Sequence, residues 1–500
     1  MEATQPPTYE YKCNKHLQQT FNKKWEETNM KKKVLSALLT TAMLASMLVG
    51  CGSSNEAPAA STDAAPAAST EAKTEAPAST EAAEPAAEEG KVFNIYCWNE
   101  EFKSRLTDHY PGYEEVDGTT GKIGDITVKW NITPSDDNAY QNNLDETLLK
   151  QADAAADDKI DLFLIEADYA LKYVDTDYTM PVKDLGITDA DLANQYQYTK
   201  DVVTDSNGNL KGVSWQGCPG VLIYNREAAK AVLGTDDPAE VQKSVSDWDT
   251  FTATAEKMKA AGYNMVSSVN DTYRVYSNNV SSKWVQDGKI VIDDNLMKWV
   301  DDSKKMVDAK ETGTFDLWSD DWSKGFYPDG KVFCYFGPAW YYNFSMGNAQ
   351  DPDKGCPGDW AIIQGPQAYF WGGTWLLAAE GSDNPEMLAD VFNAFTANED
   401  ICTKLVENES QFTNNTNVNQ KFAEDPNYGN AFLGGQNDTA IFVELAKNIK
   451  FENKTQYDQL LSEGLPKYML DYFTGEVTKD EALANFYSFV NDKYPAIVTP

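Results

Sequence analysis

The stretch GVLIYNREAAKAVLG (220–234) decides the fold class of this chain. Residues 220–225 are mainly aliphatic, which is typical of a buried strand, and from Arg226 onward strong helix formers take over. Buried strands of the same kind are predicted at KVFNIYCW (91–98), IDLFLIE (160–166) and TWLLAAE (374–380). Because such strands alternate with helical segments, the sequence predicts an α/β fold with parallel sheets.

Several helices can be predicted from the residues at their ends. In SDWDTFTATAEKMKAAG (246–262), Ser246 and Asp249 indicate a capping box and Gly262 a stop. Asn384-Pro385-Glu386 opens a helix with proline at its first position. Asp136 or Asp137 can cap a further helix, whose apolar face carries Tyr140, Leu144 and Leu148.

The chain is strongly acidic. It carries 42 Lys and Arg against 78 Asp and Glu, a formal net charge of −36. An acidic surface repels phosphate backbones, which argues against nucleic acid as a partner. The negative charge is compatible with a neutral or cationic ligand. Alternatively, it serves only to keep the protein soluble. The seven cysteines form no C-x-x-C pair and there are only two histidines, so no metal site and no cofactor are expected.

The N-terminal part has the organisation of an export signal that begins at Met30. Residues 31–33 are lysines, residues 34–49 are mainly apolar, and Leu48-Val49-Gly50-Cys51 resembles a bacterial lipobox. We therefore expect a lipoprotein signal peptide at 30–50, with a diacylglycerol on Cys51 that anchors the protein to the membrane. The alternative is an ordinary signal with a chance cysteine.

The segments on either side of this signal are predicted to lie outside the folded part. Residues 51–90 are rich in Ala, Glu, Pro, Ser and Thr and indicate a disordered tether. Residues 1–29 are expected to be untranslated upstream sequence, because the codons of Trp25-Glu26-Glu27 can contain a ribosome-binding sequence shortly before Met30.

Five segments of the chain, in this order, resemble extracellular solute-binding proteins of family 1, the carbohydrate receptors of ABC importers. They are GVLIYNREAAKAVLG (220–234), VSDWDTFTATAEKMKAAG (245–262), FYPDGKVFCYFGPAWYYN (326–343), WGGTWLLAAEGSDNPEMLADVFNAFTANED (371–400) and GEVTKDEALANFYSFV (475–490). The resemblance implies two α/β lobes joined by two or three crossover strands, with a ligand held between the lobes by hinge closure.

By position, crossovers are expected near 211–216 and 372–376, with a third within 415–435. Lobe 1 would then comprise 91–212 plus 374–430, and lobe 2 would comprise 213–373 plus 431–500. The resemblance further implies a monomeric, non-enzymatic receptor on the extracellular face of the cell membrane. Such a receptor captures a carbohydrate, here expected to be an oligosaccharide, and delivers it to an ABC permease.

A sugar needs aromatic rings for its C–H faces and fixed polar groups for its hydroxyls. In open sheets a ligand meets the carboxyl ends of strands, so contacts are expected from the residues after strands, from the crossovers and from the segment FGPAWYY (336–342). The predicted ligand-binding residues are Trp98, Asn99, Glu100, Asn138, Glu166, Asp168, Trp215, Gln216, Trp340, Tyr341, Trp371, Gly372, Gly373 and Trp375.

Some of these residues also have a structural interpretation. Trp98 and Trp375 can belong to the core, and Glu166 and Asp168 can cap a helix. Trp248 and Trp299 lie on apolar helical stripes and are predicted core residues. Trp318 and Trp322 are assigned to neither the core nor the site.

No catalytic motif accompanies these residues. The sequence has no G-x-S-x-G, no G-x-G-x-x-G and no P-loop. Carboxylate pairs are the exception, since among 78 acidic residues some pair will stand at glycosidase spacing. Two alternatives therefore stay open: the same fold binding a cationic solute such as a polyamine, and a surface glycoside hydrolase.

Overall fold

The structure is a computed structural model that describes residues 90–341, 345–346 and 359–500. All of these residues belong to one compact unit, Glu84–Pro500. The expected upstream sequence (1–29), the signal peptide (30–50), Cys51 and all but the last residue of the tether (51–90) lie outside the described residues.

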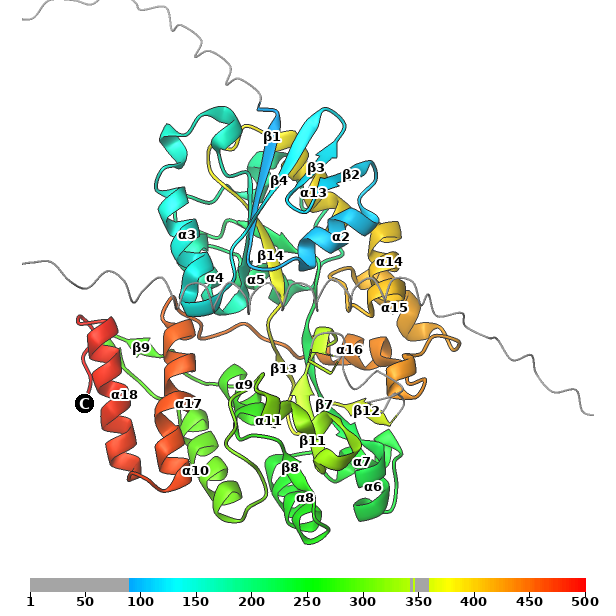
Figure 1. The fold of residues 1–500 in the computed structure, drawn as a ribbon, viewed down its shortest axis with the longest axis vertical. Helices are drawn as coiled ribbons and strands as arrows, with labels where there is room; N and C mark the ends of the chain where they lie inside the picture. The colour runs from blue at the N-terminus through cyan, green and yellow to red at the C-terminus, as the bar shows by residue number, and fades with distance from the viewer. Residues whose placement is uncertain (1–89, 342–344, 347–358) are drawn as a thin grey trace, which may run out of the picture. The chain divides into compact units, whose positions relative to one another are not determined.

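The first lobe is built on a seven-stranded sheet with the order β2-β3-β4-β1-β5-β14-β6 (Figure 1). β1 is parallel to β4 and β5, whereas β2, β3 and β4 form an antiparallel meander and β14 is antiparallel to β5 and β6. The strands are β1 (Val92–Cys97), β2 (Tyr113–Asp117), β3 (Thr120–Ile123), β4 (Ile126–Ile132), β5 (Leu162–Glu166), β6 (Gly212–Ser214) and β14 (Thr374–Ala378). The sheet is thus mixed rather than parallel as expected, because β2 and β3 are joined by tight turns and β14 enters from the second lobe.

The second lobe contains a sheet with the order β12-β7-β11-β8, to which β13 adds by pairing with β7. Only β8 and β11 are parallel in this sheet, and the pairs made by β7 are antiparallel. The strands are β7 (Pro219–Asn225), β8 (Asn264–Val266), β11 (Val332–Gly337), β12 (Trp360–Ile363) and β13 (Tyr369–Phe370). A separate hairpin joins β9 (Val285–Gln286) and β10 (Lys289–Ile290).

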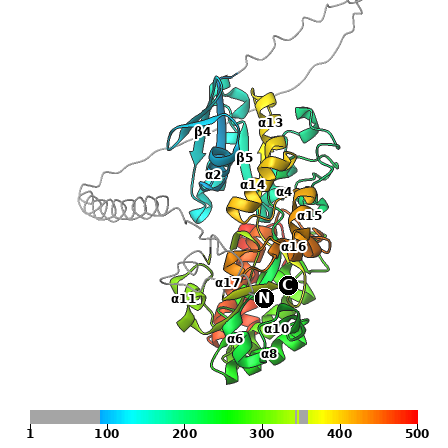
Figure 2. The ribbon, with the colours of Figure 1, turned by 90° about the vertical axis from the view of Figure 1, so that its right-hand side faces the viewer.

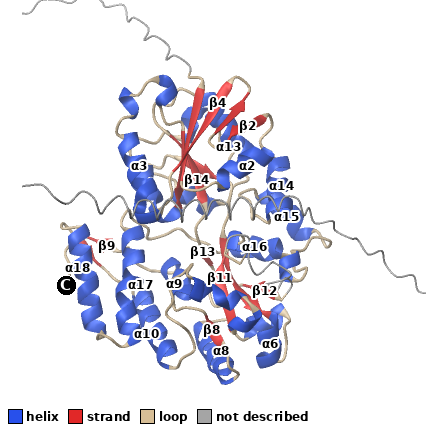
Figure 3. Cartoon of the chain, viewed as in Figure 1, coloured by secondary structure: helices blue, strands red, loops and turns tan. Residues whose placement is uncertain are grey.

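Helices surround both sheets (Figure 3). In the first lobe they are α2 (Glu101–His109), α3 (Ala139–Leu148), α4 (Ala170–Val174), α5 (Gln197–Val202), α13 (Pro385–Thr396) and α14 (Glu399–Glu409). The rings of Phe102 on α2 and Phe395 on α13 meet over one face of the first sheet, with centroids 5.2 Å apart. Figure 2 shows α13 and α14 following one another down one side of this lobe.

The second lobe has more helices than the first. They are α6 (Arg226–Leu233), α7 (Pro238–Lys243), α8 (Trp248–Ala260), α9 (Asn270–Asn278), α10 (Asp294–Asp308), α11 (Asp320–Ser323), α16 (Asp438–Ala446), α17 (Asp458–Thr474) and α18 (Lys479–Lys493). Helices α9, α10, α17 and α18 form an apolar cluster of their own, in which Trp299 is fully buried as predicted. Trp248 is partly buried and stacks on the Tyr276 ring, with centroids 4.1 Å apart. None of the described helices combines the length and the apolar character that a membrane crossing requires.

The predicted strands are present, but two helix starts differ from the prediction. Helix α8 begins at Trp248, with a capping box between Asp247 and Thr250 rather than between Ser246 and Asp249. Helix α3 begins only at Ala139, because Asp137 and Asn138 have left-handed backbones with φ of 51° and 60°. A sequence pattern does not reveal such a left-handed turn before a helix.

The chain passes between the two sheets at well-defined places. Residues 215–218 lead from β6 to β7, and residues 371–373 lead from β13 to β14. Because β6 keeps residues 212–214 in the first sheet, the first passage begins later than the predicted boundary at 212/213. The chain returns between α14 and α16 through α15 (Thr416–Glu424), a stretch that contains the expected range 415–435, and α16 packs on β7.

The Gln216 side chain joins these passages to one another. Its Oε1 accepts a hydrogen bond from the Thr374 backbone N–H (3.1 Å), and its Nε2 donates to Gln411 Oε1 (3.1 Å) and Glu101 Oε1 (2.8 Å). Its backbone forms a bridge with Thr413. Gln216 was predicted to bind ligand, but it is 2 % exposed and both ends of its amide are bonded within the protein, so its role is structural.

The Gln216→Ala variant is expected to lower the free energy of unfolding by about 1–3 kcal/mol, because it leaves the buried Thr374 N–H without its acceptor. Urea denaturation followed by circular dichroism measures this change. Gln197→Ala is the matched control, since the exposed Gln197 amide bonds only Asp201 within α5, and it should cost less than about 0.5 kcal/mol. Equal stability of Gln216→Ala and the wild type would contradict the structural role.

Candidate functional site

Polar and aromatic side chains gather where β1 and β5 end. The two strands are parallel neighbours, so their carboxyl ends lie at the same edge of the sheet. Trp98 follows β1; it is partly buried and meets the Tyr140 ring edge to face, with centroids 5.6 Å apart. Asn99 accepts a hydrogen bond from the Glu101 backbone N–H (3.0 Å), and Glu100 is exposed. Trp98 and Glu100 thus present one aromatic ring and one free carboxylate at this edge.

Asn138 lies two residues before Tyr140, whose ring contacts Trp98. It is exposed, and it precedes helix α3 by one residue. The structure thus brings the start of α3 to the edge formed by the ends of β1 and β5.

Glu166, the last residue of β5, is the most perturbed carboxyl group at this edge. Burial, followed by the negative charge of Asp168, raises the pKa of Glu166 to about 7, although Arg274 acts in the opposite direction. No described residue donates a hydrogen bond to its carboxyl group. Near neutral pH, Glu166 therefore exists in both protonation states and can accept or donate a hydrogen bond.

The second lobe contributes three indole rings, which we call the aromatic platform: Trp318, Trp340 and Trp371. Their centroids are 6.2 Å (Trp318–Trp340), 5.7 Å (Trp318–Trp371) and 5.6 Å (Trp340–Trp371) apart. Trp340 follows β11, and its Nε1 donates to the Trp371 carbonyl (3.3 Å). Burial falls from Trp371, 7 % exposed, through the partly buried Trp340 to Trp318, 51 % exposed.

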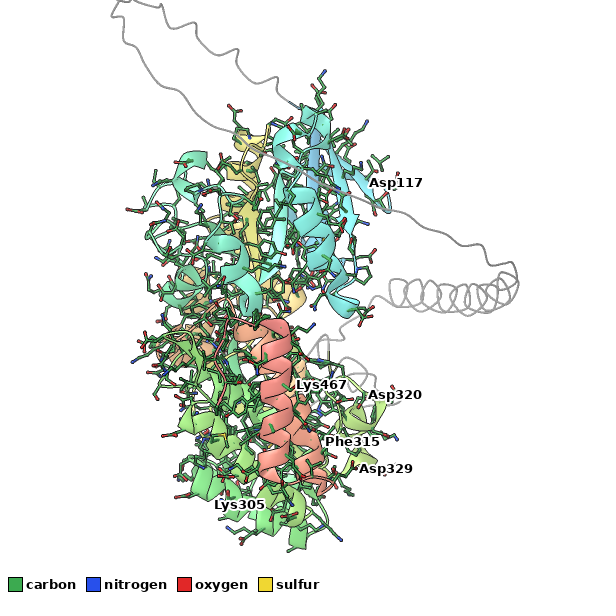
Figure 4. All side chains as sticks on the ribbon, turned by 90° about the vertical axis from the view of Figure 1, so that its left-hand side faces the viewer. Asp117, Lys305, Phe315, Asp320, Asp329 and Lys467 are labelled. Carbon is green, nitrogen blue, oxygen red and sulfur yellow. The ribbon has the colours of Figure 1, made fainter. Side chains whose placement is uncertain are left out.

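Trp318 is the member of the platform that the sequence did not assign. It lies in the loop before α11, with a left-handed φ of 72°, a conformation that is an outlier for a bulky residue. The buried Trp322 ring supports it edge to face (5.1 Å) and is itself held by a hydrogen bond from Nε1 to Asp271 (2.7 Å). Figure 4 shows Phe315 and Asp320, which flank Trp318 in the chain, on the same side of the second lobe. Strained, exposed aromatic residues of this kind concentrate at binding sites.

Two glycines lie where the second passage meets the platform. Gly372 and Gly373 have φ of 68° and 94°. A Cβ on Gly372 would stand 3.4 Å from the Trp340 ring, and a Cβ on Gly373 would stand 3.1 Å from the Trp375 ring. The left-handed backbone favours glycine at both positions, and at Gly373 a Cβ would in addition be tight against the indole.

An ion pair connects the end of β5 in the first lobe with the second lobe, next to the aromatic platform. The Arg274 guanidinium on α9 binds the Asp168 carboxylate through both Nη atoms, with Nη1 2.6 Å from Oδ1 and a second bond between Nη2 and Oδ2. Burial alone would raise the pKa of Asp168, but Arg274 outweighs it and holds this pKa below its usual value. The same guanidinium lies over the Trp371 ring, 5.6 Å from its centroid. The carboxylates of the first lobe and the platform of the second are therefore neighbours.

A small cavity adjoins this ion pair. Its volume is about 20 Å³, which is room for about one water molecule and not for a sugar. Residues of both lobes line it, among them Asp168, Arg274, Gly372 and Asp458. The cavity is therefore too small to hold the ligand itself, and the exposed surface of the platform is provided by Trp318 and Trp340.

Three other predicted site residues lie in the core. Trp215 is fully buried and stacks on Phe102 (5.0 Å), Trp375 is 1 % exposed and donates to the Thr199 carbonyl (2.8 Å), and Tyr341 is fully buried beneath the platform. A ring without exposed surface offers no face to a ligand, so these three are corrected to core residues. Strand and crossover positions gave no signal that distinguishes them from Trp340.

A profile described as "Bacterial extracellular solute-binding protein" matches residues 117–430. A search of curated proteins found no match.

Solved structures show the same fold. The crystal structure of an extracellular solute-binding protein family 1 member shares 18% identity, covering 80% of this chain and 98% of that one with a TM-score of 0.66. The ABC-transporter-associated binding protein from B. animalis subsp. lactis Bl-04, in complex with β-1,6-galactobiose, shares 18% identity over 82% and 99% of the two chains, with a TM-score of 0.59. The galacto-N-biose-/lacto-N-biose I-binding protein from Bifidobacterium longum shares 15% identity over 82% and 97%, with a TM-score of 0.58. These similarities establish the two-lobed fold.

The raised pKa of Glu166 gives a prediction about stability. A carboxyl group whose pKa is higher in the folded state stabilises the fold below its unfolded pKa, and this contribution is lost as the pH rises from about 4.5 to about 7. Glu166→Gln should therefore stabilise the protein at pH 8 by roughly 1–3 kcal/mol and change little at pH 4. Calorimetry at both pH values measures this difference.

The control for this experiment is Glu146→Gln on the exposed face of α3, which should leave the melting temperature nearly unchanged at both pH values. A Glu166→Gln variant that is no more stable than the wild type at pH 8 would show that the Glu166 carboxylate is well solvated.

Proposed function

Because the chain belongs to the bacterial extracellular solute-binding protein family, we propose that it is a lipid-anchored receptor that captures a carbohydrate and delivers it to an ABC importer. The observation that supports a sugar most directly is the aromatic platform of Trp318, Trp340 and Trp371, which lies beside hydrogen-bonding carboxylates of the other lobe. Indole faces bind the C–H surface of a sugar ring, and carboxylates accept its hydroxyls.

We propose Trp340 and Trp318 as the stacking residues, and Trp98, Glu100 and Glu166 as their counterparts in the first lobe. Similar structures with bound β-1,6-galactobiose and lacto-N-biose support a carbohydrate as the ligand. The three platform rings touch one another, so they offer one compact surface rather than a row of subsites. This arrangement favours a short oligosaccharide. We propose in addition that the receptor is a monomer and binds this ligand without catalysis.

A cationic solute such as a polyamine is the second candidate. Glu166 receives no hydrogen bond from the described residues, and Arg274 is already engaged by Asp168. An ammonium group could therefore pair with Glu166 and lie against an indole face. A glycoside hydrolase that uses two of these carboxylates is the third reading.

Titration of the purified protein with an oligosaccharide panel and with spermidine, followed by tryptophan fluorescence and chromatography of the sugars, separates these candidates. Saturable sugar binding without turnover is expected. Release of shorter sugars would establish a hydrolase, and a response to spermidine alone would establish the second candidate.

The same titration tests the platform. Trp340→Ala and Trp318→Ala should each weaken sugar binding by at least about tenfold, which corresponds to ~1.4 kcal/mol of lost stacking. Both variants should keep a melting temperature near that of the wild type, because neither ring is fully buried. Tyr178→Ala, which removes a 39 % exposed ring outside the site, is the control and should bind normally. A large loss of stability in Trp340→Ala would identify this residue as core.

The anchor is tested separately. In cells, the wild-type protein should fractionate with membranes and incorporate a labelled fatty acid, whereas Cys51→Ser should do neither, because the thiol is the proposed acylation site. A Cys51→Ser protein that still carries the label would refute the lipobox. Detection of a peptide from residues 1–29 would refute the proposed start at Met30.

A further inference from the structure

The ion pair between Asp168 and Arg274 has no evident role in sugar binding, because each side chain is already bonded to the other. Asp168 belongs to η4 (Ala167–Tyr169), directly after β5 in the first lobe, and Arg274 belongs to α9 in the second. The side chain of Asp168 is 27% exposed and that of Arg274 is 21% exposed. Two parallel hydrogen bonds between a guanidinium and a carboxylate fix distance and orientation together.

The surroundings of this pair distinguish it from ordinary surface pairs. Trp371 covers one side of the guanidinium, so the cation is held between an indole face and a carboxylate. Beyond the pair, Gln141 on α3 donates to Gln459 on α17 (3.1 Å), which is a second hydrogen bond between the lobes. Most single exposed ion pairs contribute little, but a half-buried, bidentate pair with a stacked cation is a stronger link.

We propose that Arg274 is a positioning residue of the ligand site: through Asp168 it holds the two lobes at the spacing seen here, and it covers Trp371 so that a ligand stacks on Trp340 and Trp318. Only the part of this inference that concerns ligand stacking rests on the proposed function. The link between the lobes is a property of the protein alone and can be measured without any solute.

The geometry supports this role in two ways. The cavity beside the pair is lined by residues of both lobes and has room for about one water molecule, so the two lobes are closely packed around the pair. The loop that carries Trp318 is tied to the same helix, because the hydroxyl of Ser268, just before α9, donates to the Phe315 carbonyl (2.6 Å). Helix α9 therefore positions both the ion pair and the exposed indole.

Hydrogen exchange of the full-length, ligand-free protein, followed by mass spectrometry, tests the proposal. Arg274→Met and Asp168→Asn should each raise exchange several-fold at the ends of α3 and α17 around Gln141 and Gln459, which do not contact the pair. The double variant should show no more exchange than either single variant, because all three variants lose the same ion pair. The charge reversal Asp168→Arg with Arg274→Asp should restore part of the protection.

Lys479→Met is the matched control, since Lys479 pairs with Asp301 (2.6 Å) between α18 and α10 within the second lobe. It should leave exchange around Gln141 and Gln459 unchanged. Exchange that rises only within 167–174 and 270–278 would show a local effect and overturn the proposal, as would unchanged exchange in Asp168→Asn. Failure of every sugar to bind would refute the proposed function and leave this result intact.

Discussion

The buried amide of Gln216 is the interaction on which the arrangement of the two lobes depends. It bonds the first passage of the chain to the start of β14 and to Gln411, which follows α14, and it also reaches Glu101 at the start of α2. An amide at 2 % exposure has no access to bulk water, so all of its donors and acceptors must be satisfied by the protein. The passages of the chain between the two lobes are therefore held to one another at Gln216.

The ligand site is arranged around that point. The second passage carries Trp371, Gly372 and Gly373 directly into β14, whose neighbour β5 ends at Glu166. The platform and the carboxylates are thus positioned by adjacent backbone, and the pair Arg274–Asp168 adds a link through side chains. Acidic and aromatic groups meet here because strands of both sheets end here. In α/β folds, ligands usually bind at the ends of strands.

The sequence was sufficient to predict the α/β class, the main strands and the passages near 215 and 372, because buried strands and glycine-rich breaks leave clear local patterns. It was not sufficient to sort the tryptophans. Trp215 and Trp375 occupy strand or passage positions that resemble site positions, and only packing against Phe102 or Thr199 shows that they are core. Trp318 was not assigned because its exposure follows from a left-handed backbone that local composition does not encode. No local pattern marks Arg274 as a site residue, because its partner Asp168 lies 106 positions away in the chain.

The bond between Asp168 and Arg274 also bears on the kinetics of capture. When two lobes are already linked, a large fraction of molecules has the competent spacing, so little of the ligand's binding free energy is spent on selecting that state. The same link opposes separation of the lobes, so any entry of ligand that requires them to separate becomes slower. A receptor with linked lobes retains its solute for longer and acquires it more slowly than one with unlinked lobes.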